Sequence, residues 1–228
     1  MNIRDFIGQY RNHPVLFIGA GISLRYLNNS HTWDGLLKHI AFELKGNNEF
    51  YSDIKAECQF DGKYNYALIA TKLEKAFNQA LGEDRNGKFK DINDYFYAEM
   101  ERENNLSRFK IYISKLVGTL SYREDKKEEL AELKKIRKNV GSVITTNYDG
   151  LVEDVFSFEP LVGNDILLSN PYGSVYKIHG CNKDPSKIII TEDDYSHFDN
   201  KYELIRAQLL SIFIHNPIIF MGYGIGDE

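Results

Sequence analysis

Four short segments of the sequence contain residue types that can bind a nucleotide or move a proton. They are Gly19-Ala20-Gly21-Ile22-Ser23, Thr145-Thr146-Asn147-Tyr148-Asp149, His179-Gly180 and Gly222-Tyr223-Gly224. Each segment comes at the end of a short apolar run, and such runs are typical of buried strands in a parallel sheet. Because the carboxyl ends of parallel strands share one edge of the sheet, we expect the four segments to face one cleft.

The first segment suits a phosphate group. Glycine at positions 19 and 21 permits a tight turn and a close approach of ligand to backbone. Amides at the start of the following helix can then bind a pyrophosphate, and we expect the space beside Gly21 to be reserved for it. The third glycine of the dinucleotide fingerprint is replaced by Leu24, so a strand-to-helix turn without a ligand remains the alternative.

The polar segments offer acid–base chemistry. Asn147 supplies a donor and an acceptor, Asp149 supplies a carboxylate, and a histidine such as His179 can act as a general base near neutral pH. Each has a structural alternative, because Asn and Asp often cap helices and a single histidine is often satisfied at the rim of a sheet.

The remaining sequence predicts the elements that position these segments. Strands are predicted at residues 15–18, 142–146, 174–178, 187–191 and 218–221. Apolar residues at helical spacing predict helices around residues 36–44, 66–81, 106–120, 130–136 and 202–214, the first with Thr32 as its N-cap. This order indicates one α/β domain over residues 1–228, a doubly wound, Rossmann-like parallel sheet with an inserted helical module at about 34–138.

Composition excludes several classes of protein. The net charge of -5 disfavours a nucleic-acid-binding surface. The sequence contains no apolar run long enough to cross a bilayer and no signal-peptide pattern at its beginning, so we expect a cytoplasmic location and no membrane partner. Cys58 and Cys181 lie far apart and form no zinc pattern, and we expect no metal.

Taken together and in this order, the segments resemble the sirtuin-like superfamily. Residues 19–23 match the opening phosphate-binding motif of sirtuins, and residues 145–149 resemble their Thr-Gln-Asn-Ile-Asp segment. His179-Gly180 matches their catalytic His-Gly pair, and Gly222 resembles their late nucleotide-binding turn. The resemblance spans nearly the whole chain, although the helical module is not diagnostic.

Two departures distinguish the chain from sirtuin deacylases. Where deacylases continue with Pro-Asp-Phe-Arg, this chain has Leu24-Arg25-Tyr26-Leu27. It also lacks the four cysteines of the deacylase zinc module, which helps to form the acyl-lysine groove. The chain therefore resembles the NAD-consuming sirtuin-like domains of bacterial antiphage defence systems.

That resemblance implies an NAD glycohydrolase that releases nicotinamide and ADP-ribose. Asn147 would orient the ribose and the attacking water, and His179 would be the base that acts on water or on a ribose hydroxyl. Asp149 would hold the nicotinamide side or order the Asn147 loop. NAD would be the substrate, with NADP left open. The implied NAD-binding residues are Gly19, Ala20, Gly21, Ile22, Ser23, Thr146, Asn147, Asp149, His179, Gly222 and Tyr223.

Other functions of the same fold remain open at this point. An ADP-ribosyltransferase, a protein deacylase or a non-catalytic nucleotide sensor would use the same segments. The resemblance also implies an abortive-infection effector that forms a homo-oligomer. We further expect that the chain is the N-terminal part of a longer protein, in which a C-terminal sensor region or a partner protein controls activity.

Overall fold

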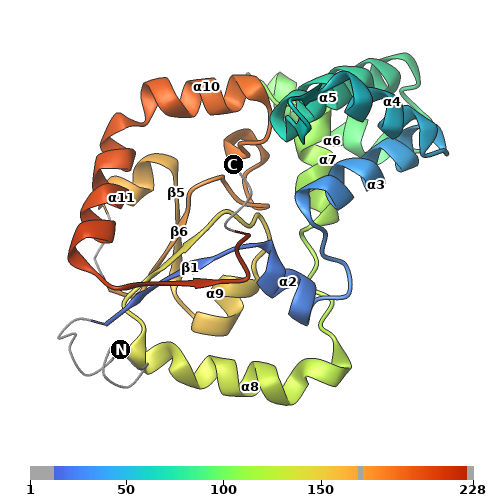
Figure 1. Ribbon diagram of the computed structural model, residues 1–228. Helices are drawn as coiled ribbons and strands as arrows, with labels where there is room; N and C mark the ends of the chain where they lie inside the picture. Colours follow the sequence, from blue (N-terminus) through green and yellow to red (C-terminus); the bar gives the residue numbers. More distant parts are fainter. Residues whose placement is uncertain (1–12, 169–171, 225–228) are drawn as a thin grey trace. The chain divides into compact units, whose positions relative to one another are not determined.

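The computed structural model describes residues 13–168 and 172–224, which form two compact units (Figure 1). The sheet unit comprises the residues up to Ser30, Leu120–Gly180 and the residues from Tyr202 onward. The helical unit comprises His31–Thr119 and Cys181–Lys201. In the part of the chain that the structure describes, no helix is both long enough and apolar enough to span a bilayer.

The sheet unit is built on five parallel strands in the order β5-β6-β4-β1-β7. The strands are β1 (Val15–Ile18), β4 (Val143–Thr145), β5 (Glu159–Val162), β6 (Ser174–Lys177) and β7 (Ile218–Met221). The three central strands are buried along their whole length, as is typical of parallel sheets covered on both faces. The predicted doubly wound α/β fold is confirmed.

Alternating side chains of each strand divide the core between the two faces. Leu16 and Ile18 face the layer that contains α2 (Ala20–Tyr26), α8 (Lys127–Lys135) and α9 (Leu151–Phe156). Val15 and Phe17 face the layer that contains η3 (Gly163–Leu168) and α11 (Glu203–His215). Figure 1 shows α8 and α9 on one side of the strands and α11 on the other. Short 3-10 turns, η1 (Glu124–Lys126) and η2 (Ile136–Asn139), flank α8.

The helical unit has a core of its own, in which Leu37, Ile40, Leu73, Phe77 and Phe109 are fully buried. Its helices are α3 (Trp33–Lys45), α4 (Glu49–Glu57), α5 (Tyr66–Glu83), α6 (Lys90–Glu101), α7 (Arg108–Leu116) and α10 (Glu192–Lys201). It also contains the hairpin β2 (Gln59–Phe60) and β3 (Lys63–Tyr64), and η4 (Pro185–Lys187). The predicted N-cap is confirmed, because the Thr32 hydroxyl accepts a hydrogen bond from the amide of Gly35 at 3.0 Å.

The helical unit differs from the predicted insertion at residues 34–138. Helix α8 was expected in the insertion, but Leu130, Leu133 and Ile136 pack against the core of the sheet unit. Residues 181–201, which sequence order places between strands, belong to the helical unit instead. Local periodicity gives a helix its apolar face but does not identify the surface that buries it.

The strand predicted at residues 187–191 is wrong. Ile188 and Ile190 are buried, which explains the strand-like pattern, but the segment joins no ladder. The backbone amides of Ile190 and Thr191 donate instead to the Asp194 carboxylate, at 3.1 and 3.0 Å. The segment therefore leads into α10 as a capped turn.

A close backbone contact joins the carboxyl ends of β1 and β7. The amide of Gly19 donates to the carbonyl of Met221 at 3.1 Å, and the amide of Gly21 donates to that of Gly222 at 2.8 Å. A Cβ on Gly222 would lie 2.5 Å from the Ile22 nitrogen, and this glycine also has a φ of +61°. Only glycine combines that conformation with so close an approach.

We predict that Gly222→Ala lowers the free energy of unfolding by about 1–3 kcal/mol, because a Cβ adds backbone strain to a steric clash. Urea unfolding of the purified protein measures the change. Gly150→Ala is the matched control, since Gly150 has a φ of -94° and open space where the added methyl group would lie; it should change the value by less than about 0.5 kcal/mol. Equal stability of the two variants would contradict the steric argument.

Candidate active site

The predicted polar residues lie at the carboxyl edge of the central strands. Thr145 of β4 pairs with Lys177 of β6, and Asn147 and His179 each follow two residues beyond that pair. Thr145 also pairs with Ile18 of β1, directly before Gly19. The register therefore brings Gly19, Asn147 and His179 to the ends of three adjacent strands, as the sequence predicts.

Asn147 is 7% exposed, and its hydrogen bonds fix the orientation of its amide. Nδ2 donates to the Gly19 carbonyl at 3.1 Å and to Ser23 Oγ at 3.0 Å. The Gly19 carbonyl can only accept, so the nitrogen must face it. Both Nδ2 hydrogens are thereby used, and Oδ1 has no hydrogen-bond partner among the described residues. Asn147 can therefore meet a ligand only as an acceptor.

Asp149 and Ser23 support Asn147 from the side of α2. Ser23 Oγ donates to Asp149 Oδ2 at 2.7 Å, and Asp149 Oδ1 accepts from the amide of Leu151 at 3.0 Å. Ser23 is 2% exposed and Asp149 is 9% exposed. Of the two roles that the sequence leaves to Asp149, these contacts favour ordering of the Asn147 loop.

Thr145 completes the network from β4. Its hydroxyl donates to the carbonyl of Ile18 at 2.8 Å and accepts from the amide of Asn147 at 3.1 Å. One hydroxyl thus links the end of β1 to the backbone of the next loop. Thr146, the neighbouring candidate, is partly exposed at the same edge.

In the first glycine turn, several groups that could meet a ligand already have partners within the protein. The side chain of Ile22 belongs to the hydrophobic core, and its amide donates to the Gly19 carbonyl at 3.2 Å. The amide of Gly21 is also used, by Gly222. Ala20 and Gly21 are partly exposed, whereas Gly19 is buried.

The reason for glycine at position 21 differs from the expected one. A Cβ there would lie 2.8 Å from both the Cα and the carbonyl oxygen of Gly222. The space beside Gly21 is thus filled by the turn after β7. A larger residue would break this contact whether or not a pyrophosphate binds nearby.

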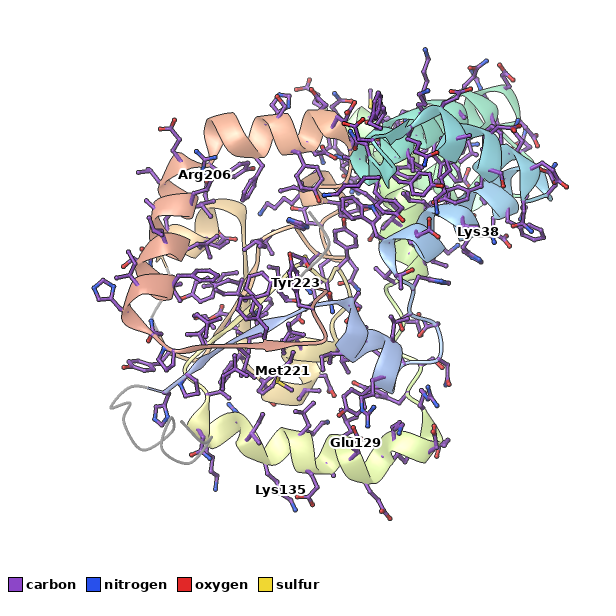
Figure 2. The ribbon with its side chains drawn as sticks, in the orientation of Figure 1. Lys38, Glu129, Lys135, Arg206, Met221 and Tyr223 are labelled. Atoms are coloured by element: carbon purple, nitrogen blue, oxygen red, sulfur yellow. The ribbon has the colours of Figure 1, made fainter. Side chains whose placement is uncertain are left out.

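Tyr223, labelled in Figure 2 beyond Met221, covers the end of β1. Its ring makes an edge contact with Phe17 at a centroid distance of 4.9 Å. A Cβ on Gly19 would lie 2.9 Å from Tyr223 Cδ2. Tyr223 therefore places a partly exposed aromatic ring at the sheet edge where the candidate residues lie.

His179 lies at the end of β6 in surroundings that disfavour its charged form. Its surface is partly accessible, yet the protein around the ring removes most of the solvent from it. Burial lowers the pKa of His179 to about 4. The imidazole is therefore neutral at physiological pH, and a neutral ring can accept a proton.

Lys177 is a residue of this region that the sequence reasoning missed. It is 0% exposed, and its Nζ contacts the carboxylate of Glu153 at 2.9 Å and the carbonyls of Tyr148 and Asp149. The signal was present in the sequence, because a lysine in a strand buried on both faces requires internal partners.

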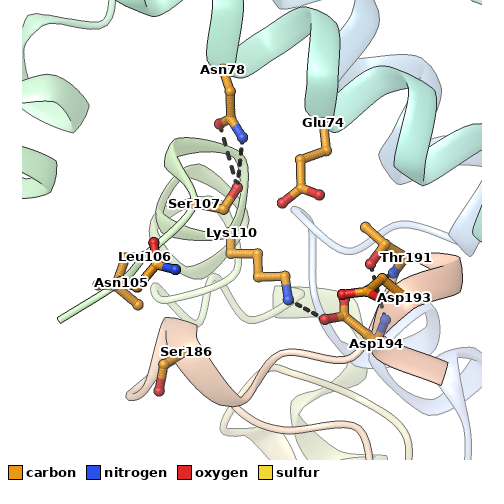
Figure 3. Close-up of a pocket in the computed structure, with 10 residues that line it drawn as sticks. All are labelled: Glu74, Asn78, Asn105, Leu106, Ser107, Lys110, Ser186, Thr191, Asp193 and Asp194. Atoms are coloured by element: carbon orange, nitrogen blue, oxygen red, sulfur yellow. Dashed lines mark hydrogen bonds and ion pairs between the residues drawn. The ribbon is translucent and has the colours of Figure 1, made fainter. Parts of the chain in front are cut away.

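The helical unit contains a surface cavity of about 320 Å³ (Figure 3). It includes none of the predicted site residues, and its polar groups already have structural roles. The Asp194 carboxylate accepts a hydrogen bond from the amide of Thr191, and the Thr191 hydroxyl accepts one from the amide of Asp194. These two bonds form a capping box at the start of α10. Lys110 forms an ion pair with Asp194, and Asn78 accepts from the amide of Phe109. This cavity is therefore not the candidate active site.

Among the described residues, no three His, Cys, Asp or Glu side chains lie close enough together to hold a metal ion. Cys58 and Cys181 are both buried free thiols of the helical unit. The chemistry that the described edge offers consists of a fixed amide acceptor, a neutral imidazole and backbone groups.

Comparison with known proteins agrees with this arrangement. The SIR2-like domain family matches residues 141–228, which include β4, Asn147, His179 and β7. The predicted sirtuin-like resemblance is confirmed, and residues 141–228 are similar to the SIR2-like domain family.

Three curated relatives extend the comparison. Defense-associated sirtuin 2 of Bacillus subtilis is 30% identical over 115 residues, covering 46% of this chain and 11% of the relative. NAD(+) hydrolase ThsA of Enterococcus faecium is 32% identical over 92 residues, covering 36% of this chain and 19% of the relative. NAD(+) hydrolase ThsA of Cytobacillus dafuensis is 24% identical over 234 residues, covering 99% of this chain and 38% of the relative. The chain thus spans well under half the length of each relative.

The lowered pKa of His179 predicts a pH dependence of stability. As the pH falls from 7 to 5, the histidine of the unfolded chain, with a pKa of about 6.5, gains a proton that the folded protein excludes. The free energy of unfolding should therefore fall over this range, by about 2 kcal/mol from His179 alone.

Urea unfolding of the wild type and His179→Gln at pH 7 and pH 5 tests this prediction. The variant should lose less stability between the two pH values, by about the same 2 kcal/mol. Equal losses, or an imidazole that titrates near pH 6.5 in NMR spectra of the folded protein, would show that the ring is not desolvated.

Proposed function

We propose that this chain carries an NAD glycohydrolase, which splits the nicotinamide–ribose bond and releases nicotinamide and ADP-ribose. The observation that supports it most is the fixed orientation of Asn147, whose Oδ1 is left for a ligand at the sheet edge where His179 follows the adjacent strand β6. Two relatives of the chain are named as NAD(+) hydrolases, and the family match covers both residues.

In this proposal, Asn147 and His179 have separate roles. Asn147 Oδ1 accepts a hydrogen bond from a ribose hydroxyl and orients the attacking water. The bond between nicotinamide nitrogen and ribose carbon breaks with its electron pair on nicotinamide, and the water oxygen bonds to that carbon. His179 accepts the proton that the water loses and returns it to solvent. Because the transition state resembles an oxocarbenium ion, positioning and exclusion of water contribute more than a strong nucleophile.

The remaining candidates would hold the substrate. Residues 19–23 would bind the pyrophosphate through the backbone, with Thr146 beside them. Gly222 and Tyr223 would border the nucleotide, and Asp149 would keep the Asn147 loop in place through Ser23. No metal is needed for any of these roles.

The relatives also suggest a biological setting. One is named as a defense-associated sirtuin, and all three are much longer than this chain. We therefore propose an antiphage effector of the abortive-infection type that acts as a cytoplasmic homo-oligomer. A C-terminal sensor region or a partner protein would control its activity, as unrestrained NAD loss would harm the cell.

A second function, transfer of ADP-ribose to protein, would use the same acceptor and base. Deacylation is less consistent with the sequence, which has two distant cysteines where the deacylase zinc module needs four. A nucleotide sensor would bind NAD without turnover.

The products formed from NAD distinguish these functions. The protein, in its full natural length, is incubated with NAD and analysed by chromatography and by mass spectrometry of the protein. We expect nicotinamide and free ADP-ribose in equal amounts. ADP-ribose attached to protein would favour the transferase, and NAD binding without products would favour the sensor; either result would overturn the hydrolase proposal.

We predict that Asn147→Ala and His179→Ala each lower the rate of NAD cleavage by about 100- to 10,000-fold, because the first loses the oriented acceptor and the second loses the base. Initial rates with purified, folded proteins measure the effect. Asn139→Ala and His215→Ala are matched controls, since both side chains are exposed in the sheet unit. Near-normal turnover by folded His179→Ala would rule out its assigned role.

A further inference from the structure

Lys177 is placed unlike any other lysine among the described residues, because its side chain is 0% exposed within a strand. Its ammonium group has three hydrogen-bond donors. One is directed at Glu153 Oε1 at 2.9 Å, one at the Asp149 carbonyl and one, at 3.4 Å, at the Tyr148 carbonyl. All three donors are therefore used within the protein.

The two carbonyls belong to the loop that carries Asn147. On the α2 side, Ser23 holds this loop through the side chains of Asn147 and Asp149. On the β6 side, Lys177 holds its backbone at the next two residues, and Glu153 at the start of α9 compensates the charge. The loop is thus held by one group from helix α2 and by another from strand β6.

A buried ammonium is costly unless it is fully paired, so its position here requires an explanation. The apolar side chains of β6, such as Val175, would fill a sheet interior without that cost. A lysine adds hydrogen-bond donors that fix two backbone carbonyls. An apolar residue at position 177 would leave both carbonyls without this partner.

We propose that Lys177 is a positioning residue, which holds the loop of residues 147–149 so that Asn147 Oδ1 keeps the place at which it meets the substrate. This inference rests on the proposed NAD cleavage. Lys177 does not itself touch the substrate, because its ammonium group is inaccessible and its donors are occupied. Its loss acts on the reaction through Asn147.

The test uses Lys177→Met, which keeps the length of the side chain and removes the donors. Because this change leaves Glu153 without its partner, the double variant Lys177→Met/Glu153→Gln is made alongside it. Lys134→Met is the matched control. It removes the exposed ion pair between Lys134 of α8 and Asp154, which neighbours Glu153 on α9.

We expect kcat for NAD cleavage to fall by about 10- to 100-fold in the folded double variant, because small displacements of an orienting group have effects of that size. KM should change by less than about threefold, and the control should match the wild type. A merely structural lysine would lower the melting temperature without changing kcat of the folded protein. An unchanged kcat in the folded double variant would therefore overturn the proposal.

Hydrogen–deuterium exchange separates this inference from the proposed function. Peptides that cover residues 145–151 should exchange faster in the double variant than in the control, with or without NAD. If the wild type does not cleave NAD, the hydrolase proposal fails, while faster exchange still supports the loop-holding role. Unchanged exchange in these peptides would refute that role whatever the activity.

Discussion

The hydrogen bond from Asn147 Nδ2 to the carbonyl of Gly19 is the interaction on which the arrangement of the site depends. A carbonyl at the end of β1 can only accept, so it fixes which end of the amide faces the protein. Ser23, Asp149 and Thr145 then complete the bonds around this amide. In a buried environment a missing partner would cost more than a single bond contributes, so the network holds one geometry.

Local sequence patterns predicted most of the fold, because the spacing of apolar residues within a strand or helix reflects which of its faces is buried. The run of residues 15–18 and helix α3 with its Thr32 cap are confirmed. The failures depend on distant partners. Residues 187–191 have a strand pattern but bond to Asp194, and β5, whose residues are only partly buried, gave no strong apolar run. The packing of α8 against the sheet likewise has no local signal.

For the candidate site, the sequence predicted the residue types and the edge of the sheet but not the reason for each residue. Gly21 was expected to leave room for a ligand, whereas the turn at Gly222 occupies that space. Ser23 was expected to contribute its backbone to the phosphate-binding turn, and the structure adds a separate role for its buried side chain, which bonds to Asn147 and Asp149. Both outcomes depend on loop residues more than 120 positions away in the sequence. The sequence indicates that Lys177 needs internal partners, but only the structure shows that two of them are carbonyls of the loop that carries Asn147.

The low pKa of His179 is consistent with the chemistry of the proposed reaction. The nicotinamide ring of NAD is cationic, and cleavage of its bond to ribose moves positive charge onto the sugar. An imidazolium beside it would repel both the substrate and the transition state, whereas the neutral ring of His179 does not. A weak base suffices because water bound to a nearly formed cation is far more acidic than free water. Burial of His179 thus lowers the basicity of the imidazole but avoids a positive charge that would oppose the reaction.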